Sequence, residues 1–358
     1  MMKSIDQLII ALLLVSFTAG CVKEDHFGFS DGADILSLEL SNQNGTPFID
    51  RQNDSLYVEV ANGTDLSQLV VKSLELSPFA KATIAVGDTL DFSESSELRV
   101  GVTAESGAVS SWSFNVFELG SQPQISNSDF NTWHNRGTYL DLGVDDESSA
   151  WGTSNPGAVF GGITPNVQQL EMTTGDYAVK LTTRFTWVGS LVGKPIASGS
   201  VFTGDFQEGN ISFDNPQAAV KFGIPFTATP ASFSVDYQYT PGEKNMDASQ
   251  NALPYADTGD MYILLERREE EQVKRVATAW FRIEEGTSSM KNITVNFTYG
   301  QLPAGSPEYM LPGEGETYAA EGEVPTHIVA VFSSSANGND YEGAENSVLI
   351  IDNLVLNY

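Results

Sequence analysis

The sequence predicts an all-β protein built from two β-sandwiches, and three features support this prediction. The chain contains 32 glycines and 15 prolines, which are common in the turns between strands. Between these turn residues lie short runs rich in Val, Ile, Phe and Tyr, which favour strands. A length of 358 residues suits two domains of roughly 100–200 residues each.

Residues 33–119 are predicted to form the smaller sandwich. Strand-like segments separated by Asn, Gly and Asp occur at 35–40, 56–60, 69–76, 83–86, 98–104 and 112–119. This spacing predicts an immunoglobulin-like fold. Residues 63–66 (GTDL), 91–93 (DFS) and 112–117 (WSFNVF) also resemble the immunoglobulin-like spacer domains found near the anchor of surface lipoproteins. No cluster here has a catalytic composition, so we expect a spacer.

A polar segment separates the two predicted domains. Residues 120–124 read GSQPQ, and a polar stretch broken by proline is typical of a linker. The second and larger domain is expected to occupy residues 125–358.

The end of the chain predicts two buried strands. Residues 328–332 and 347–358 are rich in apolar side chains, and a polar turn containing Gly338 and Gly343 separates them. A terminal strand with this much apolar surface must be covered on both sides. We therefore expect the last strand to lie in the centre of a sheet.

The segment 264–276 carries a charge pattern that is common in helices, but its flanks have the period of a strand. Ile263 and Leu265 alternate before it, and Ala277 and Ala279 alternate after it. An alternation of two indicates strands. We expect a hairpin with a charged, solvated tip.

The charge balance excludes one class of partner. The chain has 47 acidic and 18 basic residues, a formal net charge of −29. Phosphate binding needs a basic face, so we exclude a nucleic-acid partner. The excess acid predicts a solvated acidic surface, and carboxylates gathered around a cation are the alternative.

The first residues predict an exported lipoprotein. Residues 1–20 carry one lysine and a short apolar run at 8–17, which is typical of a secretory signal and too short for a membrane span. The sequence TAGC ends at Cys21, the only cysteine, and resembles a bacterial lipobox. Residues 21–32 are expected to form a tether. Within it, residues 23–25 (KED) resemble a signal for display on the outer face of the outer membrane.

The second domain resembles a known family. The pieces that carry the resemblance are 192–200 (VGKPIASGS), 221–226 (KFGIPF), 237–242 (YQYTPG) and 333–335 (SSS). Together they are similar to the putative carbohydrate metabolism domain family of surface lipoproteins. The resemblance implies a jelly roll like that of carbohydrate-binding modules, glycans as ligands, and other glycan-utilisation lipoproteins of the surface as partners. It implies no required cofactor.

The sequence points to no catalytic residue. His134 is the only histidine suited to act as a base, because His26 lies in the tether and His327 opens an apolar strand. No serine elbow lies near it, and no zinc-binding spacing of Cys and His occurs. A glycoside hydrolase needs only two carboxylates, which this composition neither excludes nor locates. That activity is the first alternative to glycan binding, and a structural adhesin or pilus component is the second.

Aromatic residues are the candidates for sugar binding, because rings stack on the C–H faces of sugars. Trp133, Tyr139 and Trp151 lie in stretches rich in Gly and Asn, where we expect them at loop edges. We expect them to bind a neutral or mildly charged glycan. The other tryptophans are assigned to the cores: Trp112, Trp187 and Trp280.

Two aspartates are candidates for a structural calcium site. Jelly-roll carbohydrate modules often hold calcium between their first and last strands, where Asp129 and Asp352 stand. Such modules usually have an acidic residue where this chain has Asn131. In the alternative interpretation, Asp352 and Asn353 cap a bulge through backbone hydrogen bonds.

We predict that Cys21 carries the lipid anchor. Cys21→Ala should move the protein from the membrane fraction to the soluble fraction, because the acyl chains then have no attachment site. Fractionation of cells followed by immunoblotting measures this. If the variant still sediments with membranes, another segment anchors the chain.

Overall fold

A computed structural model describes residues 28–358 except 94, 119, 121, 213–215 and 270–271. The predicted signal, Cys21 and the segment 23–25 lie outside the described residues. The chain divides into two compact units at the 119/120 junction, where the sequence predicts a linker. Within the described part, no helix has the length and apolarity needed to cross a membrane.

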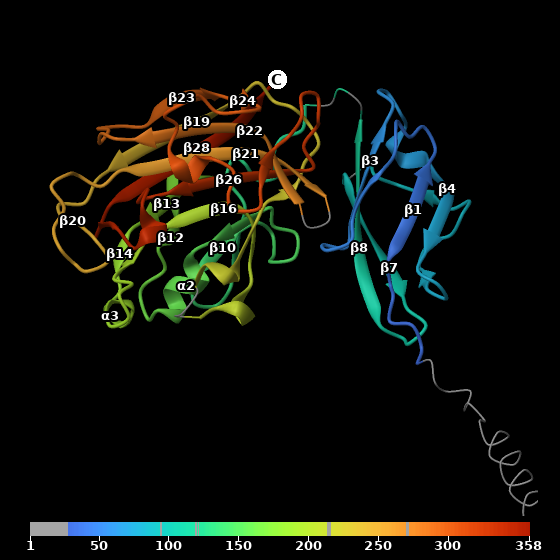
Figure 1. Cartoon of the computed structure of the whole chain (residues 1–358), viewed down its shortest axis with the longest axis horizontal. Coiled ribbons are helices and arrows are strands. Elements are labelled where there is room, and N and C mark those ends of the chain that lie inside the picture. The colour runs from blue at the N-terminus through green and yellow to red at the C-terminus, as the bar shows by residue number, and fades with distance from the viewer. Residues whose placement is uncertain (1–27, 94, 119, 121, 213–215, 270–271) are drawn as a thin grey trace, which may run out of the picture. The chain divides into compact units, whose positions relative to one another are not determined.

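The N-terminal unit is a sandwich of two sheets (Figure 1). One has the order β1-β4-β6 and the other β2-β3-β8-β7-β5, in which β3 and β8 are parallel. The strands are β1 Ile35–Leu40, β2 Phe48–Asp50, β3 Ser55–Val60, β4 Leu69–Leu76, β5 Lys81–Ala82, β6 Thr89–Leu90, β7 Glu97–Thr103 and β8 Val109–Glu118. Both sheets contribute to one core, in which Trp112 is fully buried and donates from Nε1 to the Ala33 carbonyl at 3.0 Å.

One predicted strand of this unit is wrong. Residues 83–86 form bends and a turn. The Asp88 carboxylate accepts the Ala85 N–H at 2.8 Å, and the Asp88 N–H donates to the Ala85 carbonyl at 3.1 Å. These local bonds close a turn where apolar residues alone suggested a strand.

Two large sheets form the C-terminal unit. The nine-stranded sheet follows β11-β16-β26-β21-β22-β24, with β17, β18 and β25 attached, and the five-stranded sheet follows β12-β13-β28-β19-β23. The nine strands are β11 Trp151–Thr153, β16 Ser200–Phe206, β17 Val220–Phe222, β18 Ile224–Pro225, β21 Gly259–Glu269, β22 Gln272–Ile283, β24 Thr298–Tyr299, β25 Thr317–Tyr318 and β26 His327–Ser333. The five are β12 Val167–Thr173, β13 Asp176–Thr182, β19 Ser232–Thr240, β23 Lys291–Asn296 and β28 Val348–Asn357.

Short elements connect these sheets. The hairpin strands are β9 Trp133–Asn135 with β10 Leu140–Leu142, β14 Arg184–Phe185 with β15 Ile196–Ala197, and β20 Asn245–Met246 with β27 Gly343–Ala344. The helices are α2 Asn155–Phe160 and α3 Trp187–Ser190, and the 3-10 turns are η1 Leu66–Gln68, η2 Glu208–Asn210, η3 Pro216–Ala219, η4 Glu308–Met310 and η5 Gly338–Asp340.

The main core lies between the two large sheets. Met261, Ile263 and Leu265 of β21 pack there with Leu349 and Ile351 of β28. The face of the nine-stranded sheet that points away from this core is called the outer face below. An all-β fold with two successive sandwiches is therefore observed, as the sequence predicts.

The two strands predicted at the end of the chain, β26 and β28, are both central, but they belong to different sheets. β26 lies between β16 and β21, whereas β28 lies between β13 and β19. A buried carboxylate connects the two ends: Asp257 Oδ2 accepts from Ser335 Oγ at 2.5 Å and from Ser347 Oγ at 2.6 Å. It also accepts the Ala344 N–H at 2.8 Å, and burial raises the pKa of Asp257.

The hairpin predicted around residues 264–276 is confirmed as β21–β22. Its charged part is less solvated than expected, because Glu266 and Arg275 are both buried. The Glu266 carboxylate accepts from Arg268 at 2.8 Å and lies 3.7 Å from the Arg275 guanidinium. Buried charges are tolerated when they are paired in this way.

We predict that core tryptophans stabilise their own unit only. Trp112→Ala should destabilise the N-terminal unit by about 3–5 kcal/mol, because it leaves a large cavity. Trp151→Ala, the reciprocal control, should do the same in the C-terminal unit. Differential scanning calorimetry of the full chain measures both. Equal shifts of every transition in both variants would show that the units unfold together.

Candidate functional site

Strand pairing places polar residues of four strands in one row on the outer face of the nine-stranded sheet. Ser200 of β16 pairs with Ser333 of β26. Ser333 pairs in turn with Asp260 of β21, and Asp260 pairs with Arg282 of β22. The Ser200 hydroxyl donates to Ser333 Oγ at 3.1 Å. Because side chains alternate across a strand, all four share the outer face.

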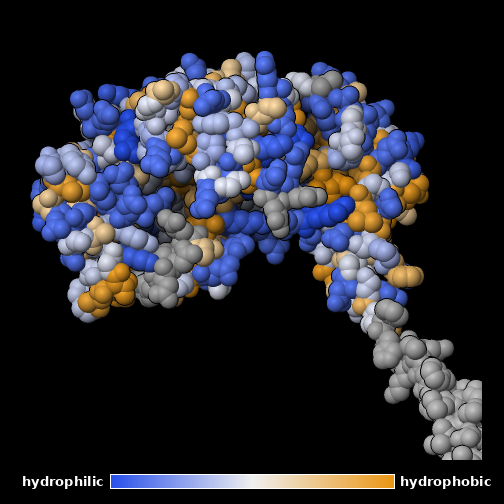
Figure 2. Space-filling model, viewed as in Figure 1, coloured by the Kyte–Doolittle hydropathy of each residue, from blue (hydrophilic) through white to orange (hydrophobic). Residues whose placement is uncertain are grey.

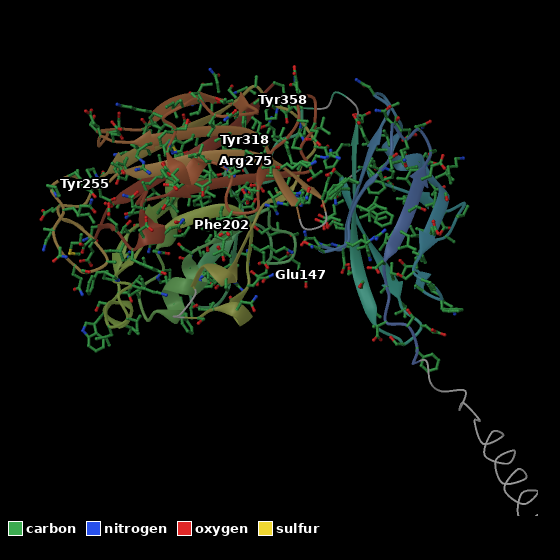
Figure 3. The ribbon with its side chains drawn as sticks, viewed as in Figure 1. Glu147, Phe202, Tyr255, Arg275, Tyr318 and Tyr358 are labelled. Carbon is green, nitrogen blue, oxygen red and sulfur yellow. The ribbon has the colours of Figure 1, made fainter. Side chains whose placement is uncertain are left out.

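The neighbouring row on the same face is apolar and aromatic. Phe202 (labelled in Figure 3) pairs with Val331, and Val331 pairs with Tyr262, which pairs with Trp280. Phe202 and Val331 belong to a buried cluster on which Tyr262 and Trp280 also pack. An antiparallel sheet often leaves one face to water, and here that face carries a second apolar surface.

A cavity of about 270 Å³ opens over these rows. Its floor includes Ser200, Phe202, Asp260, Tyr262 and Ser333. Its walls come from five segments: the helix α2, the α3 region, residues 211–212, the strand β17 and residues 335–341. This volume is close to the lower limit of about 300 Å³ for small-molecule pockets.

The lining combines rings with hydroxyl and amide groups. Phe160, Phe206 and Phe222 add apolar surface, while Asn166 and Asn339 add amides. Apolar rings with a few convergent polar groups are the usual composition of a site for a small polar ligand.

Asp260 is the titratable group at the floor. It is buried, and its Oδ1 accepts from the Trp280 indole at 2.7 Å and lies 3.6 Å from Arg282 Nε. Burial raises the pKa of Asp260 to about 6, and the nearby Arg282 guanidinium limits the shift. The carboxyl therefore changes charge near neutral pH, as groups at functional sites often do.

Arg282 is held beside Asp260 by aromatic rings. Its guanidinium lies 5.1 Å from the ring centre of Tyr309 and donates to the Tyr309 hydroxyl at 2.6 Å. The Trp280 and Tyr309 rings meet edge to face at 6.0 Å. This packing fixes the position of Arg282 beside Asp260. Asp260 is the carboxyl group at the cavity floor.

Among the lining residues that the structure describes, Asp260 is the single carboxylate and Lys194 the single cation. Lys194 Nζ lies 5.4 Å from the ring centre of Tyr341. Hydrolysis by two carboxylates requires a second acid about 5–10 Å from the first. The described lining residues can form hydrogen bonds with a ligand and stack on it, and they supply one of the two carboxylates that hydrolysis requires.

Trp151 is the clearest correction to the expected sugar-binding residues. It is only 3% exposed and packs in the main core against Phe130, with ring centres 5.2 Å apart. Its indole donates to the Ser126 carbonyl at 2.9 Å. A ring enclosed in this way has no free face, so its assignment to glycan stacking is wrong.

Trp133 and Tyr139 lie together in the β9–β10 hairpin and are not among the residues that line the cavity. Trp133 packs against the core and donates from Nε1 to the Phe130 carbonyl at 2.7 Å. The Tyr139 hydroxyl accepts from Arg136, whose guanidinium lies 5.8 Å from the ring centre. Both rings are partly covered by these contacts.

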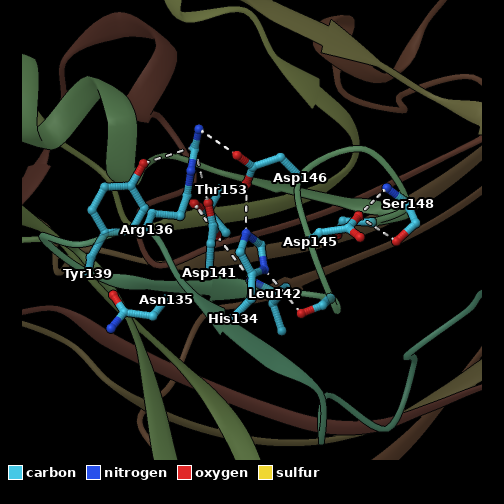
Figure 4. A network of polar contacts seen from close by, with 12 residues as sticks. His134, Asn135, Arg136, Tyr139, Asp141, Leu142, Asp145, Asp146, Ser148 and Thr153 are labelled. Atoms are coloured by element: carbon cyan, nitrogen blue, oxygen red, sulfur yellow. Dashed lines mark hydrogen bonds and ion pairs between the residues drawn. The ribbon is translucent and has the colours of Figure 1, made fainter.

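His134 belongs to a polar network in the same hairpin (Figure 4). Its Nε2 lies 2.6 Å from Asp146 Oδ1 and its Nδ1 lies 3.1 Å from the Gly143 carbonyl. Arg136 pairs with Asp146 at 3.0 Å and with Glu208 at 2.9 Å. Each ring nitrogen of His134 lies within hydrogen-bonding distance of an oxygen atom, so the ring is held between Asp146 and the Gly143 carbonyl. The network joins the hairpin to neighbouring loops.

Asp129 and Asp352 are the two residues predicted to hold a structural calcium. Asp129 accepts from Asn131, and burial raises the pKa of Asp352 to about 6. Within the described ranges, no group of three or more His, Cys, Asp or Glu side chains is placed to hold a metal ion. β28 does contain the bulge considered as the alternative: Asn353 has a φ of +51° and its N–H donates to Asp352 Oδ1 at 2.8 Å. Calcium binding stays a prediction.

One of the tryptophans assigned to the cores lies elsewhere. Trp112 is in the core as expected, but Trp187 is 68% exposed in α3. Trp280 packs on the outer face beside the cavity. The sequence held a signal for Trp187, since Thr186 can cap a helix and the glycines at 189 and 193 favour a loop.

The geometry fits the result of comparison with known families. A family model described as "Putative carbohydrate metabolism domain" matches residues 125–357. The chain belongs to this family. The C-terminal unit that holds the cavity is thus a carbohydrate-related domain, as the resemblance in the sequence implied. No match was found among curated proteins.

Two solved structures share the fold, and a third structure matches more weakly. A putative glycoside hydrolase from Bacteroides thetaiotaomicron is 24% identical, with a TM-score of 0.56 over 92% of this chain and 97% of its own. A second, from Bacteroides vulgatus, is 23% identical, with a TM-score of 0.51 over 64% of this chain and 96% of its own. A family 11 carbohydrate-binding module from Clostridium thermocellum, in complex with a mixed-linked tetrasaccharide, is 13% identical, with a TM-score of 0.29 over 60% and 92%.

We predict that Asp260 makes stability depend on pH. Its pKa is raised by folding, so its contribution to the free energy of unfolding is full below about pH 4 and lost as the pH rises through about 6. Between pH 4 and pH 7 the free energy of unfolding of the wild type should fall by about 1–3 kcal/mol relative to that of Asp260→Asn. Urea unfolding at both pH values measures this, and the other titrating groups cancel in the comparison. If the difference in unfolding free energy between the wild type and Asp260→Asn is the same at both pH values, the carboxyl is in contact with water.

Proposed function

We propose that the C-terminal unit binds an extracellular glycan in the cavity on the outer face of the nine-stranded sheet. The cavity itself is the main support, because it joins aromatic walls to hydroxyl, amide and carboxyl groups inside a domain of a carbohydrate family. Sugars present C–H faces that pack on rings and hydroxyls that need such partners.

A neutral or mildly charged glycan suits the electrostatics. Asp260 stands at the floor, Lys194 is the one described cation of the lining, and the net charge is −29. A polyanionic chain would meet repulsion from this field. Neutral hydroxyls, in contrast, can donate to the Asp260 carboxylate.

Glycan binding is favoured over hydrolysis as the primary activity. The described lining carries one carboxylate, whereas glycoside hydrolysis through a carboxylate pair needs two. Hydrolysis stays the alternative function, and the same experiment distinguishes the two. A structural role as an adhesin or pilus component would leave the cavity without a ligand.

The setting we propose is the bacterial surface. Cys21 would carry the lipid, the N-terminal unit would act as a spacer, and the C-terminal unit would face the exterior from the outer membrane. The support for this is the lipobox-like TAGC sequence and the KED segment that follows it. Other glycan-utilisation lipoproteins of the same surface would be the partners.

We predict that two substitutions in the cavity weaken binding. A glycan array identifies the ligand, and calorimetry then compares variants of the full chain. Asp260→Asn should weaken binding about ten- to hundredfold, the usual effect of losing a hydrogen bond to a charged group. Tyr262→Phe, which removes one hydroxyl, should have a smaller effect of about fivefold. Tyr255→Phe, in an exposed loop, is the matched control.

The array also tests the alternatives. Release of soluble sugars in the same wells, lost in Asp260→Asn, would favour hydrolysis. A wild type that binds none of the glycans offered would refute the proposed function.

A further inference from the structure

The loop around α3 holds apolar side chains in solvent. Trp187 is 68% exposed, Leu191 67% and Val192 55%, and Val188 is exposed as well. Figure 2 shows this hydrophobic surface at the lower left, over α3. Single exposed apolar residues are common, but several on one short loop mark a contact surface.

This exposure is built into a closed loop. Thr186 Oγ1 accepts the Gly189 N–H at 3.1 Å, and the Lys194 N–H donates to the Gly189 carbonyl at 2.8 Å. The Thr186 N–H donates to the Pro195 carbonyl at 2.8 Å. A Cβ at position 189 would lie 2.7 Å from the Thr186 methyl group, so the loop closes only around glycine. The backbone thus fixes the apolar side chains in water.

The loop forms part of the mouth of the cavity. Thr186, Gly189 and Lys194 line the cavity, as do Phe160 and Gly161 at the end of α2. The two helices are close, because a Cβ at position 161 would lie 3.7 Å from Thr186 Oγ1. Phe160 is itself 48% exposed. The exposed Trp187 therefore directly follows Thr186, a residue that lines the cavity.

We propose that Trp187 is a second sugar subsite outside the cavity. One end of a glycan chain occupies the cavity, and a later sugar ring of the same chain stacks on the Trp187 indole. The ligand is then an oligosaccharide or polysaccharide chain, and not a free monosaccharide. This inference rests on the proposed function, and it adds the class of ligand to it.

A membrane is the other surface that an exposed tryptophan contacts, and the observations favour the glycan. Membrane-binding surfaces combine apolar residues with clusters of Lys and Arg. This loop contributes Lys194 alone, and the net charge of −29 opposes approach to anionic lipid. The loop is also continuous with a cavity of the composition that sugars need.

A length series tests the proposal. The probes are neutral linear oligosaccharides of glucose, mannose and xylose, from one to six residues, titrated against the full chain by calorimetry. Wild-type affinity should rise by about tenfold or more once the chain is long enough to leave the cavity. Trp187→Ala should abolish that rise, and Trp187→Tyr should keep much of it. Leu191→Ala, an aliphatic change in the same loop, should leave it intact.

The outcomes separate this inference from the proposed function. If Asp260→Asn weakens binding while Trp187→Ala matches the wild type at every length, the subsite is refuted and the cavity stands. If the wild type binds no probe of the series and no glycan of the array, both are refuted. Sedimentation with phosphatidylethanolamine–phosphatidylglycerol vesicles that is lost in Trp187→Ala would assign the loop to the membrane instead.

Discussion

The register of four antiparallel strands is the constraint on which the rest of the C-terminal unit depends. β16, β26, β21 and β22 pair so that Ser200, Ser333, Asp260 and Arg282 form one row across the sheet. Side chains alternate with a period of two, so a slip of one residue would send this row into the core. The same pairing that buries Ile263 therefore places the floor of the cavity on the outer face.

A buried carboxylate links the two large sheets of this unit. Asp257 joins Ser335, at the end of β26, to Ser347, at the start of β28, and so connects the two sheets. Ser335 also lines the cavity. The triple-serine motif at 333–335 thus has separate tasks: Ser333 faces the outer row, while Ser334 and Ser335 bond to buried partners. A buried polar group needs such partners to avoid a large desolvation cost.

Much of the site could not be predicted, and the tryptophans show why. Trp151 stands in a glycine-rich stretch, yet Phe130 and other residues distant in sequence enclose it. Trp187 stands in an apolar stretch, yet Gly189 closes a loop that turns it to solvent. In both cases exposure depends on contacts made across the fold. Local composition indicates whether a segment forms a strand or a loop. It does not indicate which distant residues cover an aromatic ring.

The sequence by itself determined the all-β class, the β21–β22 hairpin, the central position of the last strand and the carbohydrate family. These features follow from local periodicity and from motifs, which are properties of neighbouring residues. Only the tertiary structure decided that β26 and β28 lie in different sheets, that Asp260 is buried with a raised pKa, and that a cavity opens beside α3. Alternation tells which residues share a face of a strand. Which face meets the core, and which meets a ligand, is settled by the packing of segments far apart in the chain.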